Sequence, residues 1–155
     1  MEQRTASELE IYPAIVSLAR AVIAEAFSAK VITPGVTTTD DVAWYIRQRY
    51  EALGLPVWFM PDVNLQRQGQ QCEAQAASCS SHGVIQRGDV LHTDVGICYL
   101  KLCTDTQEMG YVLKANEQDA PVGFKKALAT GNQWQDILTS QFKTGRTGNE
   151  VLANT

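Results

Sequence analysis

Two aspartates, Asp94 and Asp105, lie eleven positions apart in the segment GDVLHTDVGICYLKLCTDT. If residues 90–106 form a hairpin centred on Tyr99 and Leu100, the aspartates lie directly opposite each other and point to the same face. Two carboxylates that close repel, and a divalent cation between them would keep both ionised. The spacing therefore predicts a metal site.

The chemistry of such a site would be hydrolytic. Two divalent ions about 3.5–4 Å apart can activate a water molecule and stabilise the charge that develops on a carbonyl oxygen. Oxygen ligands suit manganese, and cobalt, iron or zinc fits when an imidazole ligand joins them. The other face of the hairpin would be apolar and would pack on the core, with Leu91, Val95, Ile97 and Leu102.

Two observations leave a simpler interpretation open. Aspartates are common at strand ends and turns, where water solvates them. The turn CYLKL also lacks the Asn-Gly pair or the single glycine that is typical of a tight hairpin.

His92 and Thr104 are candidates for outer neighbours that orient the metal ligands. His92 could also be a ligand, or a structural histidine with an ordinary hydrogen bond. Cys98 and Cys103 would fall on the aspartate face, so a Cys/His zinc site competes with the carboxylate site. Because the chain has no C-x-x-C pair, we expect its four cysteines to be free thiols, and a disulfide between some of them stays open.

Composition excludes several classes of protein. The 155 residues suit one compact domain, 45% of them are hydrophobic, and the net charge is −4 with scattered Lys and Arg, so no nucleic-acid surface is expected. No apolar run approaches the roughly 20 residues of a membrane span. The first residues lack the pattern of a signal peptide, which predicts a cytoplasmic protein; a periplasmic or secreted one stays open if a leader is missing.

Periodicity predicts the elements that position these residues. We expect helices at about 7–29 and 40–53, a strand at 56–66, a loop at 66–83, strands through 114, and a helix from Asp119 that breaks at Gly131. Thr38 with Asp41, and Thr147 with Glu150, form capping-box patterns at helix starts. The helix that starts at Thr147 has only about one turn before the sequence ends, so we expect the chain to be cut at this end. A weak echo between residues 34–42 and 144–151 suggests a duplicated architecture whose second copy is mostly absent.

The segment GDVLHTDVG followed by LCTDTQ resembles the first metal-binding signature of the pita-bread metallopeptidases, the family of methionine aminopeptidase, Xaa-Pro aminopeptidase, prolidase and creatinase. The matching residues are Gly88, Asp89, Asp94, Gly96 and Asp105. The segments ITPGVTTTDDVAWYIRQRYEALGL and GNQWQDILTSQFKTGRTGNEVL are similar to two helix regions of that family. The similarity extends over nearly the whole chain and is greatest for the Xaa-Pro aminopeptidase or dipeptidase branch.

The resemblance implies that Asp94 chelates one metal ion and Asp105 bridges two. It implies an α+β fold, the first half of a pita-bread fold, with a curved antiparallel sheet and helices on its outer face. The chain departs from the family pattern in three ways. The further His and two Glu ligands do not occur in it, the place of a substrate-orienting His is taken by Ala76 and Ala77, and Gln107 stands where an Arg is usual. We do not assign the substrate-orienting role to His82.

The expected function is therefore that of a fragment, residues 1–155, of a catalytic domain that hydrolyses N-terminal peptide bonds, with Xaa-Pro peptides as substrates and two Mn, Co or Zn ions as cofactors. By itself this chain is expected to be inactive, to bind metal weakly and to associate with a second copy. The alternative is a non-catalytic pita-bread module that binds peptides or proteins.

Overall fold

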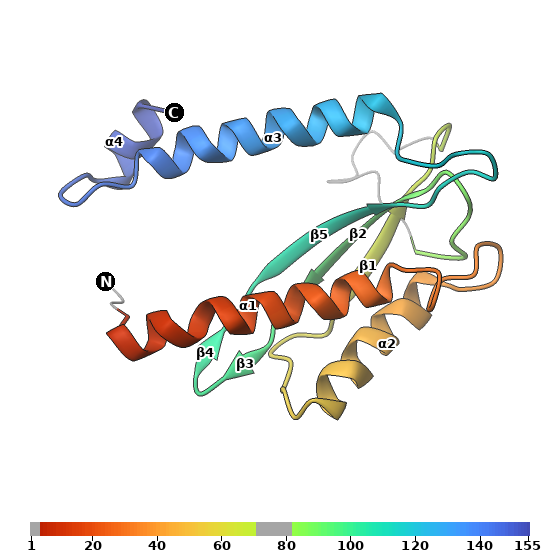
Figure 1. Ribbon diagram of the computed structural model, residues 1–155, viewed down its shortest axis with the longest axis horizontal. Coiled ribbons are helices and arrows are strands. Elements are labelled where there is room, and N and C mark those ends of the chain that lie inside the picture. The colour runs from red at the N-terminus through yellow and green to blue at the C-terminus, as the bar shows by residue number, and fades with distance from the viewer. Residues whose placement is uncertain (1–3, 71–81) are drawn as a thin grey trace. The chain divides into compact units, whose positions relative to one another are not determined.

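The structure is a computed structural model that describes residues 4–70 and 82–155 (Figure 1). The chain forms two compact units, Met1–Asn116 and Glu117–Thr155, which we describe separately. Residues 71–81 of the expected loop, with Cys72 and Cys79, lie outside the described residues.

Two helices open the first unit. Helix α1 spans Ala6–Ala26 and helix α2 spans Thr39–Ala52, close to the predicted bounds. Both begin at a capping box, in which the side chains of Thr38 and Asp41 satisfy each other's backbone N–H groups at the start of α2. Pro13 lies inside α1, which begins at Ala6.

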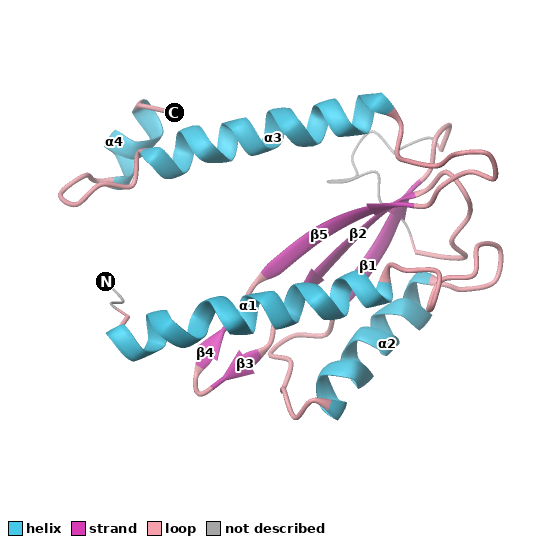
Figure 2. Ribbon diagram, in the orientation of Figure 1, coloured by secondary structure: helices cyan, strands magenta, loops and turns pink. Residues whose placement is uncertain are grey.

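An antiparallel sheet follows, and the mixed helix and sheet architecture predicted from the sequence is confirmed (Figure 2). Its strands are β1 (Asp62–Gln66), β2 (Val90–Val95) and β5 (Thr106–Tyr111), in the order β1-β2-β5. A small hairpin of β3 (Cys98–Tyr99) and β4 (Leu102–Cys103) connects β2 to β5. The strand expected from residue 56 is shorter than predicted, with only Val57 bridging to Ile97 before it begins.

One face of the sheet packs against α1 and α2 and forms the core. The apolar face predicted from the alternation is confirmed, since Leu91, Val95, Ile97 and Leu102 are all buried. The opposite face is polar, because alternation along three paired strands brings its polar residues together. It carries Asp62, Asn64, His92, Asp94 and Gln107.

The contact between α1 and α2 supports a pH-dependent prediction. Hydrogen bonds from Lys30 and Arg49, with a further one from Tyr45, lower the pKa of Glu25 to about 2. A carboxyl whose pKa is lowered by folding stabilises the protein above its unfolded value, and this contribution is lost as the pH falls through the folded value. We therefore expect Glu25→Gln to lower the melting temperature at pH 7, with the difference from wild type disappearing between pH 4.5 and 2. A constant difference in thermal unfolding across that range would contradict this prediction.

The second unit consists of α3 (Val122–Ser140) and α4 (Gly148–Ala153). The predicted break at Gly131 is wrong, because α3 continues through it; one glycine costs only about 1 kcal/mol in a helix interior. The predicted capping box of Thr147 and Glu150 is confirmed as the start of α4. None of the helices in the described residues is long and apolar enough to cross a membrane.

Candidate metal centre

Asp94 lies near the end of β2, on the polar face of the sheet. Its neighbours Thr93 and Val95 are buried on the other face. The predicted register is wrong by two residues, because Asp94 pairs with Gln107 and not with Asp105. Since the shift is even, Asp105 keeps the parity of Gln107 and is the diagonal neighbour of Asp94.

The hairpin turn explains the shift. Tyr99 pairs with Leu102, so the turn is Leu100 and Lys101, whose φ angles are 48° and 67°. A two-residue turn of this kind requires positive φ at both positions, which normally selects Asn-Gly. Leu100 and Lys101 carry no such signal, so the centre of the hairpin could not be located from residue types.

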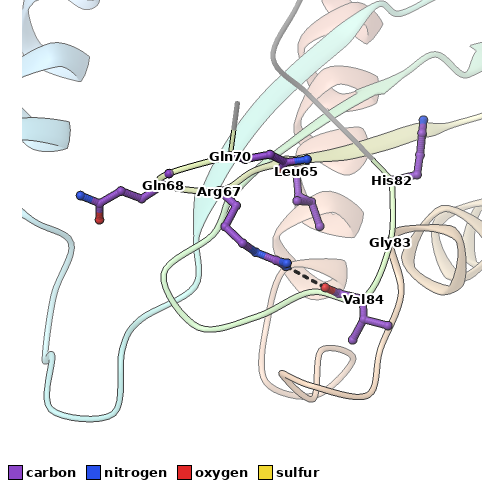
Figure 3. A pocket seen from close by; sticks show the side chains of 8 residues that line it. Leu65, Arg67, Gln68, Gln70, His82, Gly83 and Val84 are labelled. Carbon is purple, nitrogen blue, oxygen red and sulfur yellow. Dashed lines mark hydrogen bonds between the residues drawn. The ribbon is translucent and has the colours of Figure 1, made fainter. Parts of the chain in front are cut away.

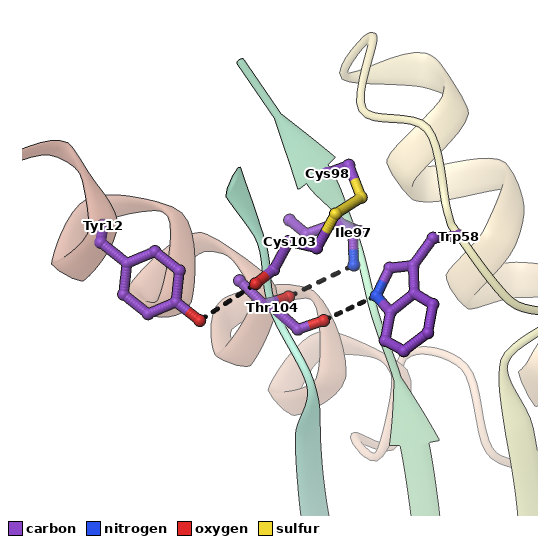
Figure 4. Close-up of a disulfide and its surroundings, with 6 residues drawn as sticks. All are labelled: Tyr12, Trp58, Ile97, Cys98, Cys103 and Thr104. Atoms are coloured by element: carbon purple, nitrogen blue, oxygen red, sulfur yellow. Dashed lines mark hydrogen bonds between the residues drawn. A yellow bond between two sulfur atoms is a disulfide. The ribbon is translucent and has the colours of Figure 1, made fainter. Parts of the chain in front are cut away.

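A disulfide between Cys98 and Cys103 closes this hairpin (Figure 4). The expectation of free thiols is therefore wrong for these two residues. The pairing also removes the thiolates that a competing Cys/His zinc site would need. The disulfide crosses the two strands that connect Asp94 to Asp105, so it restrains the segment between the two carboxylates.

The backbone just before Asp105 is held by two aromatic side chains (Figure 4). The Tyr12 hydroxyl donates to the Cys103 carbonyl at 3.1 Å, and Trp58 Nε1 donates to the Thr104 carbonyl at 2.8 Å. The buried Thr104 hydroxyl accepts from the backbone N–H of Ile97 at 3.2 Å. These contacts fix the joint between the hairpin and β5. An orienting role of Thr104 toward the metal ligands stays a prediction.

Gly96, two residues after Asp94, has no room for a side chain. A Cβ atom there would lie 2.0 Å from Trp58 Nε1, 2.5 Å from a ring carbon of Phe59 and 2.7 Å from the Thr104 carbonyl oxygen. The glycine of the D-x-G motif therefore lets Trp58 approach the backbone on both sides of the hairpin.

The carboxylate of Asp105 acts directly on that of Asp94. Burial, followed by the charge of Asp105 and a hydrogen bond to it, raises the pKa of Asp94. A hydrogen bond between two carboxylates requires a proton on one of them, and a divalent cation can take the place of that proton. Asp94 Oδ1 is buried and receives no hydrogen bond from any described residue. A buried acceptor without a donor normally implies a missing partner, so these residues fit a divalent cation.

Three further polar residues adjoin Asp94, and two of them were missed by the sequence analysis as members of the site. Gln107 Nε2 donates to Asp94 Oδ2 at 3.1 Å, while its Oε1 lies 3.2 Å from His92 Nε2. Asp62 is the partner of Asp94 on β1, and its charge also raises the pKa of Asp94. Alternation in DVNLQ places Asp62 and the buried Val63 on opposite faces of the sheet, but only the strand register brings Asp62 beside Asp94.

His82 lies on this side of the sheet but makes no close contact with the aspartate pair. Its Nε2 is 3.8 Å from Asp62 Oδ1, and its Nδ1 is 3.9 Å from Asp40 Oδ1. No group of three or more His, Cys, Asp or Glu residues in metal-binding geometry occurs within residues 4–70 and 82–155.

Asp89, the other aspartate of the signature, has a structural environment. Its buried carboxylate accepts hydrogen bonds from Nε and Nη2 of Arg67, at 2.8 Å each, and from the backbone N–H of Gln86 at 2.7 Å. Arg67 also donates to the Val84 carbonyl at 2.9 Å, beside a hollow of about 410 Å³ (Figure 3). The interaction joins the end of β1 to the start of β2.

Comparisons with known proteins agree with this architecture. A family model described as metallopeptidase family M24 matches residues 11–155. The chain is similar in structure to an X-Pro aminopeptidase from Thermotoga maritima, with a TM-score of 0.71 and 19% identity over 96% of this chain and 39% of that one. It is also similar to a prolidase from Thermococcus sibiricus, with a TM-score of 0.64 and 20% identity over 88% of this chain and 35% of that one. The chain thus spans less than two fifths of either structure. No curated protein matches it.

Proposed function

Because the chain belongs to metallopeptidase family M24, we propose that Asp94 and Asp105 are metal ligands of a two-metal peptidase centre. The proposed reaction is hydrolysis of the peptide bond near a substrate N-terminus, with a bond that precedes proline as the preferred class. The names of the two similar structures, an X-Pro aminopeptidase and a prolidase, support that substrate class. The proposed ions are Mn, Co or Zn.

The observation that carries the proposal is the buried Oδ1 of Asp94, which has no hydrogen-bond partner in residues 4–70 and 82–155, beside the carboxylate of Asp105. A pair of bound divalent ions would activate water and polarise the scissile carbonyl. The residues of this chain supply the anionic ligands, and the hairpin with its disulfide restrains the segment between them. Trp58 and Tyr12 anchor the backbone that carries Asp105.

A titration of the 155-residue chain with Mn²⁺ tests the proposal. Within the described residues only two carboxylates are assigned as ligands, so we expect weak binding, with a Kd well above the micromolar range. Asp94→Asn should abolish binding, and it should leave the metal-free chain as stable as wild type or more so, since it removes a repelled and poorly hydrogen-bonded carboxylate. Asp136→Asn, on the exposed surface of α3, is the matched control. Mn²⁺ binding that survives Asp94→Asn would refute the assignment, and micromolar or tighter binding would refute the expectation of weakness.

A non-catalytic pita-bread module that binds peptides or proteins is the second candidate. The absence of a larger ligand group among the described residues favours it. Such a module would bind an Xaa-Pro peptide equally well with and without Mn²⁺ and after Asp94→Asn, whereas the metal centre predicts that both changes weaken peptide binding.

We also propose that the chain associates with a second copy through α3, whose apolar side chains are exposed. Three of the largest are Leu128, Trp134 and Ile137, each at least 50% exposed. Apolar surface of this kind is rarely left in water by a monomer. Sedimentation should therefore show dimers at high concentration, and Leu128→Lys should shift the chain toward monomer; a wild-type chain that stays monomeric would contradict the proposal.

The cytoplasmic location predicted from the sequence stays a prediction. The Cys98–Cys103 disulfide argues against this location, because disulfides persist mainly in oxidising compartments.

A further inference from the structure

We propose that Gln107 is a positioning residue that determines which oxygen of Asp94 faces the metal ion, and that His92 acts on Asp94 through Gln107. This inference rests on the proposed metal centre and goes beyond it, since neither residue is assigned there as a ligand. It starts from the two contacts of the Gln107 amide, with Asp94 Oδ2 at 3.1 Å and with His92 Nε2 at 3.2 Å.

The chemistry of these groups sets the direction of both hydrogen bonds. Gln107 Nε2 donates to Asp94 Oδ2, so the NH₂ group of Gln107 faces Asp94. The amide oxygen of Gln107 then faces His92, and because it can only accept, His92 must carry its proton on Nε2. The three side chains thus form a directed chain in which each of the two bonds has one donor and one acceptor.

This chain leaves the two oxygens of Asp94 in different states. Oδ2 is occupied by the Gln107 donor, whereas Oδ1 is buried with no described donor. A carboxylate held at one oxygen cannot rotate freely, so the unoccupied oxygen is presented in one direction. Outer groups that orient a metal ligand in this way typically change metal affinity by 10- to 100-fold.

The register and the chemistry of glutamine both suit this role. Gln107 is the direct cross-strand partner of Asp94, and His92 is the next residue of β2 on the same face. The amide also donates without carrying charge, whereas the arginine that the family resemblance leads us to expect would place a positive charge beside the bound cations. Gln107 therefore holds Asp94 without repelling the ions.

Mn²⁺ affinity of four variants of the 155-residue chain tests the proposal, with electron paramagnetic resonance of free Mn²⁺ as the readout. We expect Gln107→Met to weaken binding about 10-fold or more. His92→Ala should weaken binding less, and should add nothing in the Gln107→Met background, because His92 acts only through Gln107. Gln66→Met is the matched control, since Gln66 lies on the same face of the sheet at the other end of β1.

Two results of this titration would overturn the inference. One is a Gln107→Met variant that binds Mn²⁺ as tightly as Gln66→Met. The other is a loss of Mn²⁺ affinity caused by His92→Ala that is as large in the Gln107→Met variant as in the otherwise wild-type chain. That result would make His92 a metal ligand itself.

A second measurement needs no metal and separates this inference from the proposed function. Nuclear relaxation of the side-chain NH₂ groups should give an order parameter for Gln107 near the roughly 0.85 of rigid backbone, and one below about 0.6 for the exposed Gln66. Asp94→Asn or His92→Ala should loosen Gln107. If the wild-type chain binds no Mn²⁺ but Gln107 is rigid in this way, the metal proposal fails and the positioning of Asp94 stands; a Gln107 as mobile as Gln66 overturns the positioning itself.

Discussion

Arg67→Met is expected to lower the free energy of unfolding by about 3 kcal/mol, the low end of what breaking a buried ion pair costs. The carboxylate of Asp89 is 1% exposed, and of the three hydrogen bonds that it accepts from the described residues, two come from the Arg67 guanidinium. Without Arg67, the buried charge of Asp89 keeps one donor among the described residues, the backbone N–H of Gln86. The low end applies because the Arg67 side chain is 42% exposed, so water can partly replace it. Urea unfolding at pH 7 measures the loss.

Two further variants make this prediction specific. Arg87→Met removes an arginine that donates to the Leu113 carbonyl and pairs with no carboxylate in the described residues, so it should cost well under 1 kcal/mol. Adding Asp89→Asn to Arg67→Met should recover part of the loss, because a neutral amide is cheaper to bury than an unpaired charge. A loss equal to that of Arg87→Met would show that the Asp89 pair does not hold β1 to β2.

Gly96→Ala is expected to lower the free energy of unfolding by about 3 kcal/mol and to weaken Mn²⁺ binding as well. The new methyl group would meet the Trp58 ring nitrogen at 2.0 Å and the Thr104 carbonyl at 2.7 Å. Trp58 would have to leave, and with it the hydrogen bond that anchors the backbone before Asp105. Thermal unfolding and the Mn²⁺ titration measure the two effects on the same sample.

Gly131→Ala is the matched control and should raise the free energy of unfolding, whereas Gly96→Ala lowers it. A Cβ at Gly131 meets nothing within 4 Å, and the residue lies inside α3, where alanine is favoured over glycine by up to about 1 kcal/mol. A Gly96→Ala variant as stable as Gly131→Ala would mean that Trp58 does not occupy this position tightly.

Much of the fold followed from short-range chemistry. The capping boxes at Thr38 and Thr147 located two helix starts, because each is complete within four residues. Alternation separated the apolar and polar faces of β2 correctly, because the period of a strand does not depend on its partners. The helix break predicted at Gly131 was wrong, because the free-energy cost of one glycine is small compared with the helix propensity of the residues around it.

The candidate site depended on register, which residue types did not supply. The hairpin turns at Leu100 and Lys101, two residues without a preference for positive φ, so its centre lies one residue beyond the predicted one. This moved Gln107 opposite Asp94 and made Asp105 a diagonal neighbour. The predicted pairing was wrong, although the predicted face for Asp94 was correct because the shift is even.

By itself, the sequence determined the types of the elements, the helix starts, the two faces of the sheet and the spacing of the two aspartates, all of which depend on residues close together in the chain. Only the tertiary structure decided which side chains meet: Asp62 and Gln107 beside Asp94, Arg67 on Asp89, Trp58 against Gly96, and the Cys98–Cys103 disulfide. The physical reason is that these contacts join residues of different strands or loops, and their pairing is set by turn geometry and packing.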